Sequence, residues 1–200
     1  MVQKLRFLVL LFALFMMTGC ATYKAQVVST DRVESYKYKT EKDGLKVAVE
    51  PYDQSDKAKA AFYVDVTSKN VRPVQLVIEN TSADNFLITR NEIRLLDKSG
   101  NEIKPLNSNF VYGLFEKNEL AYAFWGFGIF SYMSAEKANE KMQADWHEKE
   151  FPEDRTILPS RKAAGFVFFQ TPEHLEGKIL KISLINLKSN QTSELEVSLS

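Results

Sequence analysis

Apolar residues at every second position recur on both sides of the chain's centre, and this period of two most constrains the fold. Such runs lie at residues 45–49, 74–78, 93–95, 179–187 and 195–199. A period of two places alternate side chains on opposite faces of a strand, so each run predicts a half-buried β-strand. Polar turn residues separate the runs, and residues 97–100 predict a hairpin turn that leads to a returning strand at residues 103–106. A short apolar run at residues 165–169 predicts a further buried strand.

The centre of the chain has a different period. A short helix is expected at residues 55–61, but from about residue 108 to 151 the helical period dominates. Ala135, Ala138, Met142 and Trp146 then fall on one helix face. The sequence therefore predicts a fold that is mainly β with a helical insertion (α+β). We expect an immunoglobulin-like β-sandwich interrupted by a helical hairpin.

The N-terminus carries a segment of another kind. Lys4 and Arg6 precede an unbroken apolar run at residues 7–17, and Thr18, Gly19 and Cys20 follow it. The run has 11 residues, which is short of the ~20 that span a bilayer. A basic start, a short apolar stretch and small residues before a cut are typical of a secretory signal peptide. We therefore expect residues 1–19 to be removed.

The sequence Met17-Thr18-Gly19-Cys20 resembles the lipobox of bacterial lipoproteins. The resemblance implies cleavage between Gly19 and Cys20, a diacylglycerol thioether on Cys20, and acylation of the new N-terminus, for example with palmitate. Each buried lipid CH₂ contributes ~0.8 kcal/mol, so two or three chains hold a protein at a membrane. Ala21, rather than Asp, follows Cys20, and in a Gram-negative host this resemblance favours the outer membrane, facing the periplasm. The alternatives are an ordinary signal peptide with an incidental cysteine and a short buried helix.

The rest of the chain divides into two parts. Residues 20–43 are polar and mixed, and we expect them to form a lipidated N-terminus and spacer, with Tyr36 and Tyr38 able to pack as part of an edge strand. Residues 44–200 are expected to form a single β-sandwich domain with the insertion at about 108–151. Cys20 is the only cysteine, so no disulfide can form within the chain and the fold must depend on its hydrophobic core.

The order of elements supports a second, weaker resemblance. Residues 73–80 (PVQLVIEN) are followed by a hairpin, a glycine-containing apolar helix, a charged helix, Leu158-Pro159 and the 165–169 run. This order resembles a group of uncharacterised lipoproteins of Gram-negative bacteria over residues 45–185. The group carries no agreed activity, so the resemblance implies no functional residues.

Charge and side-chain chemistry exclude several functions. The chain has 26 basic and 26 acidic residues, so no basic excess exists to neutralise the phosphates of a nucleic acid. Of the two histidines, His147 lies beside Asp145, Glu148 and Glu150, but no second histidine supports a metal site there, and His174 is expected in a surface turn. No nucleophile elbow or phosphate-binding loop occurs. We expect no catalytic residues, metal or cofactor.

Residues 120–133 form an uncharged stretch with helical character. A helix that is apolar all round is either buried or in lipid. One interpretation packs it under the neighbouring helix. Another places Tyr122, Trp125 and Tyr132 at a membrane interface, where amphipathic aromatic residues settle, and a third places them against a protein partner.

Together these features predict a membrane-anchored envelope lipoprotein that acts as a structural or protein-interaction module. Its expected partners are the membrane, through the lipid on Cys20, and an envelope protein. The alternative is a lipoprotein that binds lipid or a small apolar ligand in a pocket covered by the insertion. A hydrolase based on carboxylate chemistry is a third and weaker hypothesis.

Overall fold

Two antiparallel sheets pack face to face in the computed structural model, which describes residues 25–115 and 132–200. Sheet A contains, in spatial order, β1 (Tyr38–Lys42), β2 (Leu45–Pro51), β3 (Val71–Asn80), β8 (Lys162–Gln170) and β6 (Pro105–Leu106). Sheet B contains β10 (Thr192–Ser198), β9 (Ile179–Asn186), β4 (Phe86–Leu96) and β5 (Glu102–Ile103), and β7 (Asp154–Ile157) pairs with β4. The prediction of a mainly β fold with helices is confirmed. The two packed layers are those of the predicted sandwich. The strand order differs from the immunoglobulin order, because β1, β2 and β3 follow one another within sheet A.

The core between the sheets consists of the residues that the period of two predicts. Val74, Leu76 and Ile78 of β3 are fully buried there, together with alternate residues of β2, β8, β4, β9 and β10. Each such side chain contributes ~1.5–3 kcal/mol relative to an exposed one. With no disulfide available, this core is the main source of stability.

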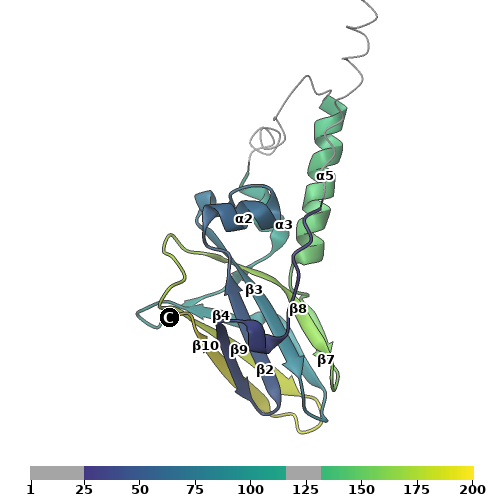
Figure 1. The fold of residues 1–200 in the computed structure, drawn as a ribbon, viewed down its shortest axis with the longest axis vertical. Helices are drawn as coiled ribbons and strands as arrows, with labels where there is room; N and C mark the ends of the chain where they lie inside the picture. Colours follow the sequence, from purple (N-terminus) through teal and green to yellow (C-terminus); the bar gives the residue numbers. More distant parts are fainter. Residues whose placement is uncertain (1–24, 116–131) are drawn as a thin grey trace, which may run out of the picture.

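A helical layer covers part of the other face of sheet A. It contains α2 (Ser55–Phe62), α3 (Ser108–Gly113) and α5 (Tyr132–Lys149), with the short 3₁₀ turn η2 (Val66–Lys69) beside α2. A second 3₁₀ turn, η1 (Val33–Ser35), packs on β2 and β3 further along the same face. Figure 1 shows α2, α3 and α5 gathered at one end of the sandwich, which we call the helical end. None of the helices in the described ranges is long and apolar enough to cross a membrane.

Trp146 lies at the centre of this second core. The side chain is fully buried, and its Nε1 donates a hydrogen bond to the backbone oxygen of Phe62 at 3.1 Å. Ala138 and Met142 are buried beside it, as the predicted helix face requires. Phe166 and Phe168 of β8 point into the same cluster, so at this end sheet A is buried on both faces.

The folded body begins earlier than the sequence predicts. Residues 38–42 lie within the predicted spacer and form the edge strand β1, as the option of an edge strand at Tyr38 allows, and β1 pairs with β2 from Tyr38↔Val49 to Lys42↔Leu45. The turn between them is Asp43-Gly44, with φ values of 53° and 73°. Asp-Gly with both residues at positive φ is the favoured two-residue hairpin turn, and it is the signal for β1 that the spacer assignment overlooks.

The strands around the predicted 97–100 turn also differ from expectation. The turn is present, since the Gly100 N–H donates to the Asp97 backbone oxygen, but the returning chain splits between the sheets. β5 pairs with β4 in sheet B, whereas β6 pairs with β8 at the edge of sheet A. Pro105 lacks an N–H group and suits the start of an edge strand, which explains why pairing changes there. The runs at 86–88 and 93–95 belong to one strand, β4, with an irregularity between Ile88 and Ile93.

Gly165 allows the chain after α5 to cross sheet A closely. A Cβ atom at this position would lie 2.6 Å from the Phe151 Cα and 2.7 Å from its nitrogen. The Phe151 N–H donates to the Phe166 oxygen at 2.7 Å, so the backbones are held together at this crossing. Only glycine fits between them without displacement.

We expect Gly165→Ala to lower the free energy of unfolding by roughly 1–3 kcal/mol, the usual range for overpacking against fixed atoms. Gly113→Ala is the matched control, because a Cβ atom there meets nothing within 4 Å. Urea denaturation followed by fluorescence measures both variants. Equal stability of the two would show that the crossing at Gly165 is not tight.

Candidate functional site

The residues proposed from sequence for membrane attachment and contact lie mostly outside the described ranges. These are Gly19, Cys20, Tyr122 and Trp125. Tyr132 is the first residue of α5 in the structure. The expectations for all five residues stay predictions.

The acidic residues around His147 have separate partners. The Asp145 carboxylate is 2.5 Å from the Lys149 Nζ, and the Glu150 carboxylate is 2.6 Å from an Arg90 Nη1 atom. His147, with a side chain 73% exposed, lies 3.6 Å from Glu150. His174 is on the surface loop between β8 and β9, 3.4 Å from the Asp53 carboxylate. Within the described ranges no three His, Cys, Asp or Glu residues are placed to hold a metal ion.

A buried ion pair joins the helical layer to the sandwich. Glu150, at the C-terminal end of α5, accepts hydrogen bonds from the Ser108 N–H at 3.0 Å and from its hydroxyl at 2.6 Å. Arg90, from the middle of β4, pairs with the same carboxylate and donates to the Phe151 oxygen at 3.1 Å. Glu150 therefore connects the start of α3, the end of α5 and sheet B. A hollow of about 630 Å³ opens beside this pair.

A second hollow, of about 490 Å³, lies beside the start of α2 at the helical end. Charged and polar side chains dominate its lining, which consists of Lys37, Tyr38, Glu50, Pro51, Asp53, Gln54, Lys57, His174, Leu175, Glu176 and Leu199. The Lys57 amine pairs with Glu50 and lies 4.5 Å from the centre of the Tyr52 ring. Burial of that ring, with the nearby Glu50 charge, raises the pKa of Tyr52 to about 12. Such a lining suits a polar ligand rather than an apolar one.

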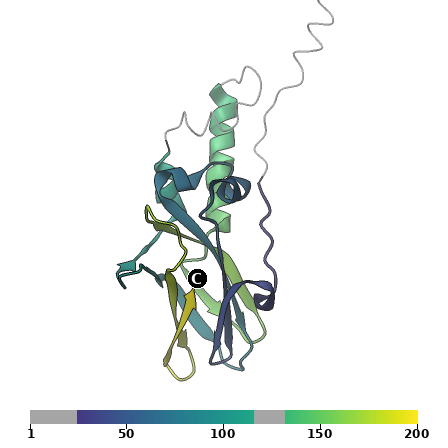
Figure 2. The ribbon, with the colours of Figure 1, turned by 60° about the vertical axis from the view of Figure 1, so that its left-hand side comes forward.

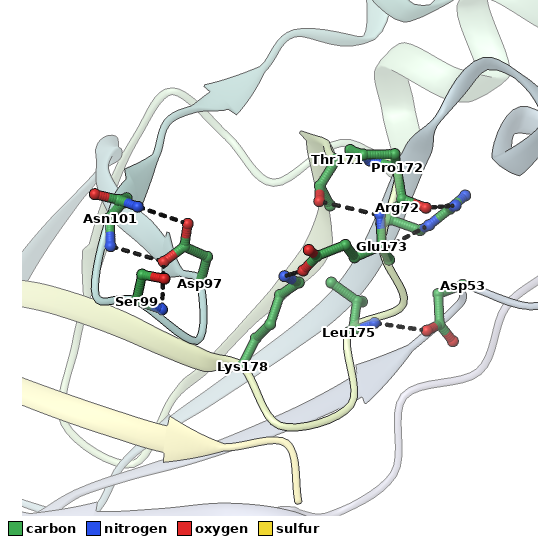
Figure 3. A network of polar contacts seen from close by, with 10 residues as sticks. All are labelled: Asp53, Arg72, Asp97, Ser99, Asn101, Thr171, Pro172, Glu173, Leu175 and Lys178. Atoms are coloured by element: carbon green, nitrogen blue, oxygen red, sulfur yellow. Dashed lines mark hydrogen bonds and ion pairs between the residues drawn. The ribbon is translucent and has the colours of Figure 1, made fainter.

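A polar network holds the loop after β8 that borders this hollow (Figure 3). The Arg72 guanidinium is buried and donates to the backbone oxygens of Thr67, Pro172 and Glu173 at 2.9–3.1 Å. The Asp53 carboxylate accepts from the Leu175 N–H at 2.9 Å. The loop is thus fixed to both η2 and the start of α2.

Lys178 is the least expected member of this network. Its side chain is 0% exposed, and its amine is 2.5 Å from the carboxylate of Glu173, which is 63% exposed. The hydrogen bond and charge of Lys178 lower the pKa of Glu173. A buried ammonium group needs such a partner because desolvation without one is expensive. Glu173 therefore acts as the counter-ion of the buried Lys178 amine.

The opposite end of the sandwich exposes a small apolar surface. Leu158, Ile185 and Leu187 are 50%, 36% and 49% exposed, and they follow or end β7 and β9, the two strands that flank β4. We call these three residues the distal tip. Buried Asn80 braces it by donating to the backbone oxygens of Asp84 and Ile157 at 2.7 and 3.0 Å.

Sequence reasoning missed Arg72, Arg90 and Lys178. Pro172, a partner of Arg72, and Glu150, the partner of Arg90, lie many positions away along the chain, so no local spacing reveals these contacts. Glu173 is only five positions from Lys178, but the two residues belong to a loop with no regular spacing. The available signal is a charged residue inside an apolar strand run, as Arg72 is between Val71 and Pro73. Such a position predicts a buried charge that needs acceptors.

No protein-family description matches the chain, and no curated protein matches it either. Three solved structures show a distant likeness. The yjhA protein of Bacillus subtilis is 12% identical with a TM-score of 0.40, covering 80% of this chain and 95% of that one. The lipoprotein candidate ycdA of the same species is also 12% identical with a TM-score of 0.40, but the match spans 38% of its length and 80% of this chain. A functionally unknown protein of Listeria monocytogenes is 14% identical with a TM-score of 0.37, covering 92% and 93% of the two chains. At this level of likeness the three structures assign neither a family nor an activity.

We expect Glu150→Ala to lower the free energy of unfolding by roughly 2–4 kcal/mol, because it removes the counter-charge of Arg90, whose side chain is only 13% exposed, and the acceptor of Ser108. Glu194→Ala is the matched control: Glu194 pairs with Lys181 at 3.2 Å, but its side chain is 55% exposed, and loss of such a pair costs ~0–1 kcal/mol. Urea denaturation compares the variants. If Glu150→Ala lowers the free energy of unfolding no more than the control does, Glu150 does not stabilise the connection between α3, α5 and sheet B.

Proposed function

We propose that this chain is a lipid-anchored module of the bacterial cell envelope that binds another envelope protein and carries out no catalysis. The observation that carries the proposal is the position of Cys20. It is the only cysteine of the chain, it ends the Met17–Cys20 sequence after an 11-residue apolar run, and it precedes the described body. A lipid on Cys20 would anchor the chain outside the folded body and leave the surface of that body free to bind a partner protein.

The distal tip supports the interaction role. Leu158, Ile185 and Leu187 are branched apolar side chains exposed at one end of a sandwich whose other apolar residues are largely buried. Apolar side chains that gather on a surface favour contact with a protein partner. The hydrogen bonds of Asn80 fix the neighbouring turns, so the surface is formed before a partner binds.

The alternative of a lipid or apolar-ligand carrier gains little support. Such a function needs an apolar cavity, whereas the hollows at Glu150 and at the start of α2 are both bordered by charged side chains. The outer membrane, facing the periplasm, is the location we propose in a Gram-negative host. Its support is Ala21 in place of an aspartate after Cys20.

We expect Cys20→Ser to block lipid attachment, so that the precursor accumulates and the protein leaves the membrane fraction. Thr18→Ser is the control, since it keeps a small residue next to the cleavage site. Labelling with radioactive palmitate, followed by cell fractionation, measures both variants. A Cys20→Ser protein that is labelled and fractionates like the parent would overturn the proposed anchor.

The partner surface has its own test. A photo-reactive residue in place of Leu187 is expected to give a discrete crosslinked product in whole cells, and the added variant Ile185→Asp should remove it by placing a charge in the contact. The same residue in place of Glu196, exposed on β10, serves as the control. Products that are identical at positions 187 and 196, or unaffected by Ile185→Asp, would exclude the distal tip as the binding surface.

A further inference from the structure

The segment before β1 is docked along the outer face of sheet A. The Gln75 side chain donates to the Ser29 oxygen at 3.0 Å, and the Val33 N–H donates to the Glu79 carboxylate at 3.2 Å. Val33 is also buried against Ala48 and Val77. Within the predicted spacer of residues 20–43, the chain is fixed to the body from about residue 28 onward.

The direction of this segment is set by its partners. Ser29 lies at Gln75 and Val33 lies at Glu79, so the segment runs along β3 away from the helical end. Followed backwards, the chain moves toward the helical end, where Val28 packs into the cluster around Trp146. Figure 2 shows the described N-terminal segment rising beside α5 at that end. The attachment point of any N-terminal anchor is therefore the helical end.

The chain between Cys20 and the body is short. Five steps lead from Cys20 to Ala25, and whatever their conformation they span at most about 18 Å. β3 alone, with ten residues, is about 33 Å long. An anchor on Cys20 thus reaches the helical end easily, but its span is shorter than the distance that separates the two ends of the sheet.

The exposed side chains at the helical end suit a lipid surface. Val27 is 95% exposed and Phe110, on α3, is 49% exposed. Exposed residues of both charges lie on the helices of this end: Asp56 and Lys59 on α2, and Glu140 and Lys141 on α5. The charges of these four described residues balance, and the two apolar side chains can enter the headgroup region.

We propose that the helical end is the membrane-facing surface of this protein, held against the bilayer by the short tether, and that the distal tip points away from the membrane. This inference rests on the proposed lipid anchor at Cys20. It explains why the apolar contact surface for a protein lies at the opposite end of the strands from the point of attachment.

The test measures the distance of each end from lipid. The purified lipidated protein carries a fluorophore on p-azidophenylalanine in place of either Lys141, on α5, or Ser189, next to the distal tip. The protein is placed in vesicles of phosphatidylethanolamine and phosphatidylglycerol that contain a headgroup-linked quencher. Because the ends are about 30 Å apart, we expect quenching at position 141 to exceed that at position 189 by at least about threefold. Equal or reversed quenching would overturn the proposal.

A tether variant identifies the cause. Insertion of about 20 Gly/Ser residues between Ala21 and Thr22 raises the maximum span from Cys20 to Ala25 to about 90 Å, and we expect the difference between the positions to shrink toward equality. An unchanged difference would overturn the short tether as its cause. A protein with no lipid on Cys20 would fail to enter the vesicles, which is a failure of the proposed function. Coupling the Cys20 thiol to a maleimide lipid then tests the orientation separately.

Discussion

Burial of sheet A on both faces is the constraint on which the rest of the structure depends. One face of β3 and β8 packs against sheet B, and the other is covered by the helical layer and by the docked N-terminal segment. Without this cover, the apolar outer face of β3 and β8 would be exposed to water, which is unfavourable. The helical insertion and the segment before β1 therefore belong to the fold itself. The insertion lies at one end of the sheet, and the segment before β1 runs from that end along β3, so the molecule has two unlike ends.

Much of this architecture follows from the period of the sequence. Val74, Leu76 and Ile78 are predicted on one face and lie there, and the continuous apolar run at 165–169 is the strand that serves both cores. The covering of the second face was only partly predictable. Ala138, Met142 and Trp146 mark one side of a helix, whereas the Asp43-Gly44 turn and buried Val33 appear in a stretch whose polar composition suggests a spacer.

The polar sites could not be predicted in the same way. Glu150, Arg90 and Ser108 meet through tertiary contacts between a helix end, a strand and another helix start, and nothing in local spacing indicates which charges pair. The same holds for the contacts of Arg72 with Pro172 and Glu173 in the loop after β8. Arg72 alone is marked by its position within an apolar run, which predicts a buried charge but not what neutralises it. The sequence therefore predicts the layers of the fold more readily than the polar contacts that connect them.

The central claim is that Cys20 carries the lipid that holds this module at a membrane. Intact-mass spectrometry of the protein purified from the membrane fraction of its host tests it most directly. The account predicts a chain that begins at Cys20 and is heavier than its 181 residues by a diacylglycerol group and an amide-linked acyl chain. A protein that retains residues 1–19, or one that begins elsewhere with an unmodified thiol at Cys20, would contradict it.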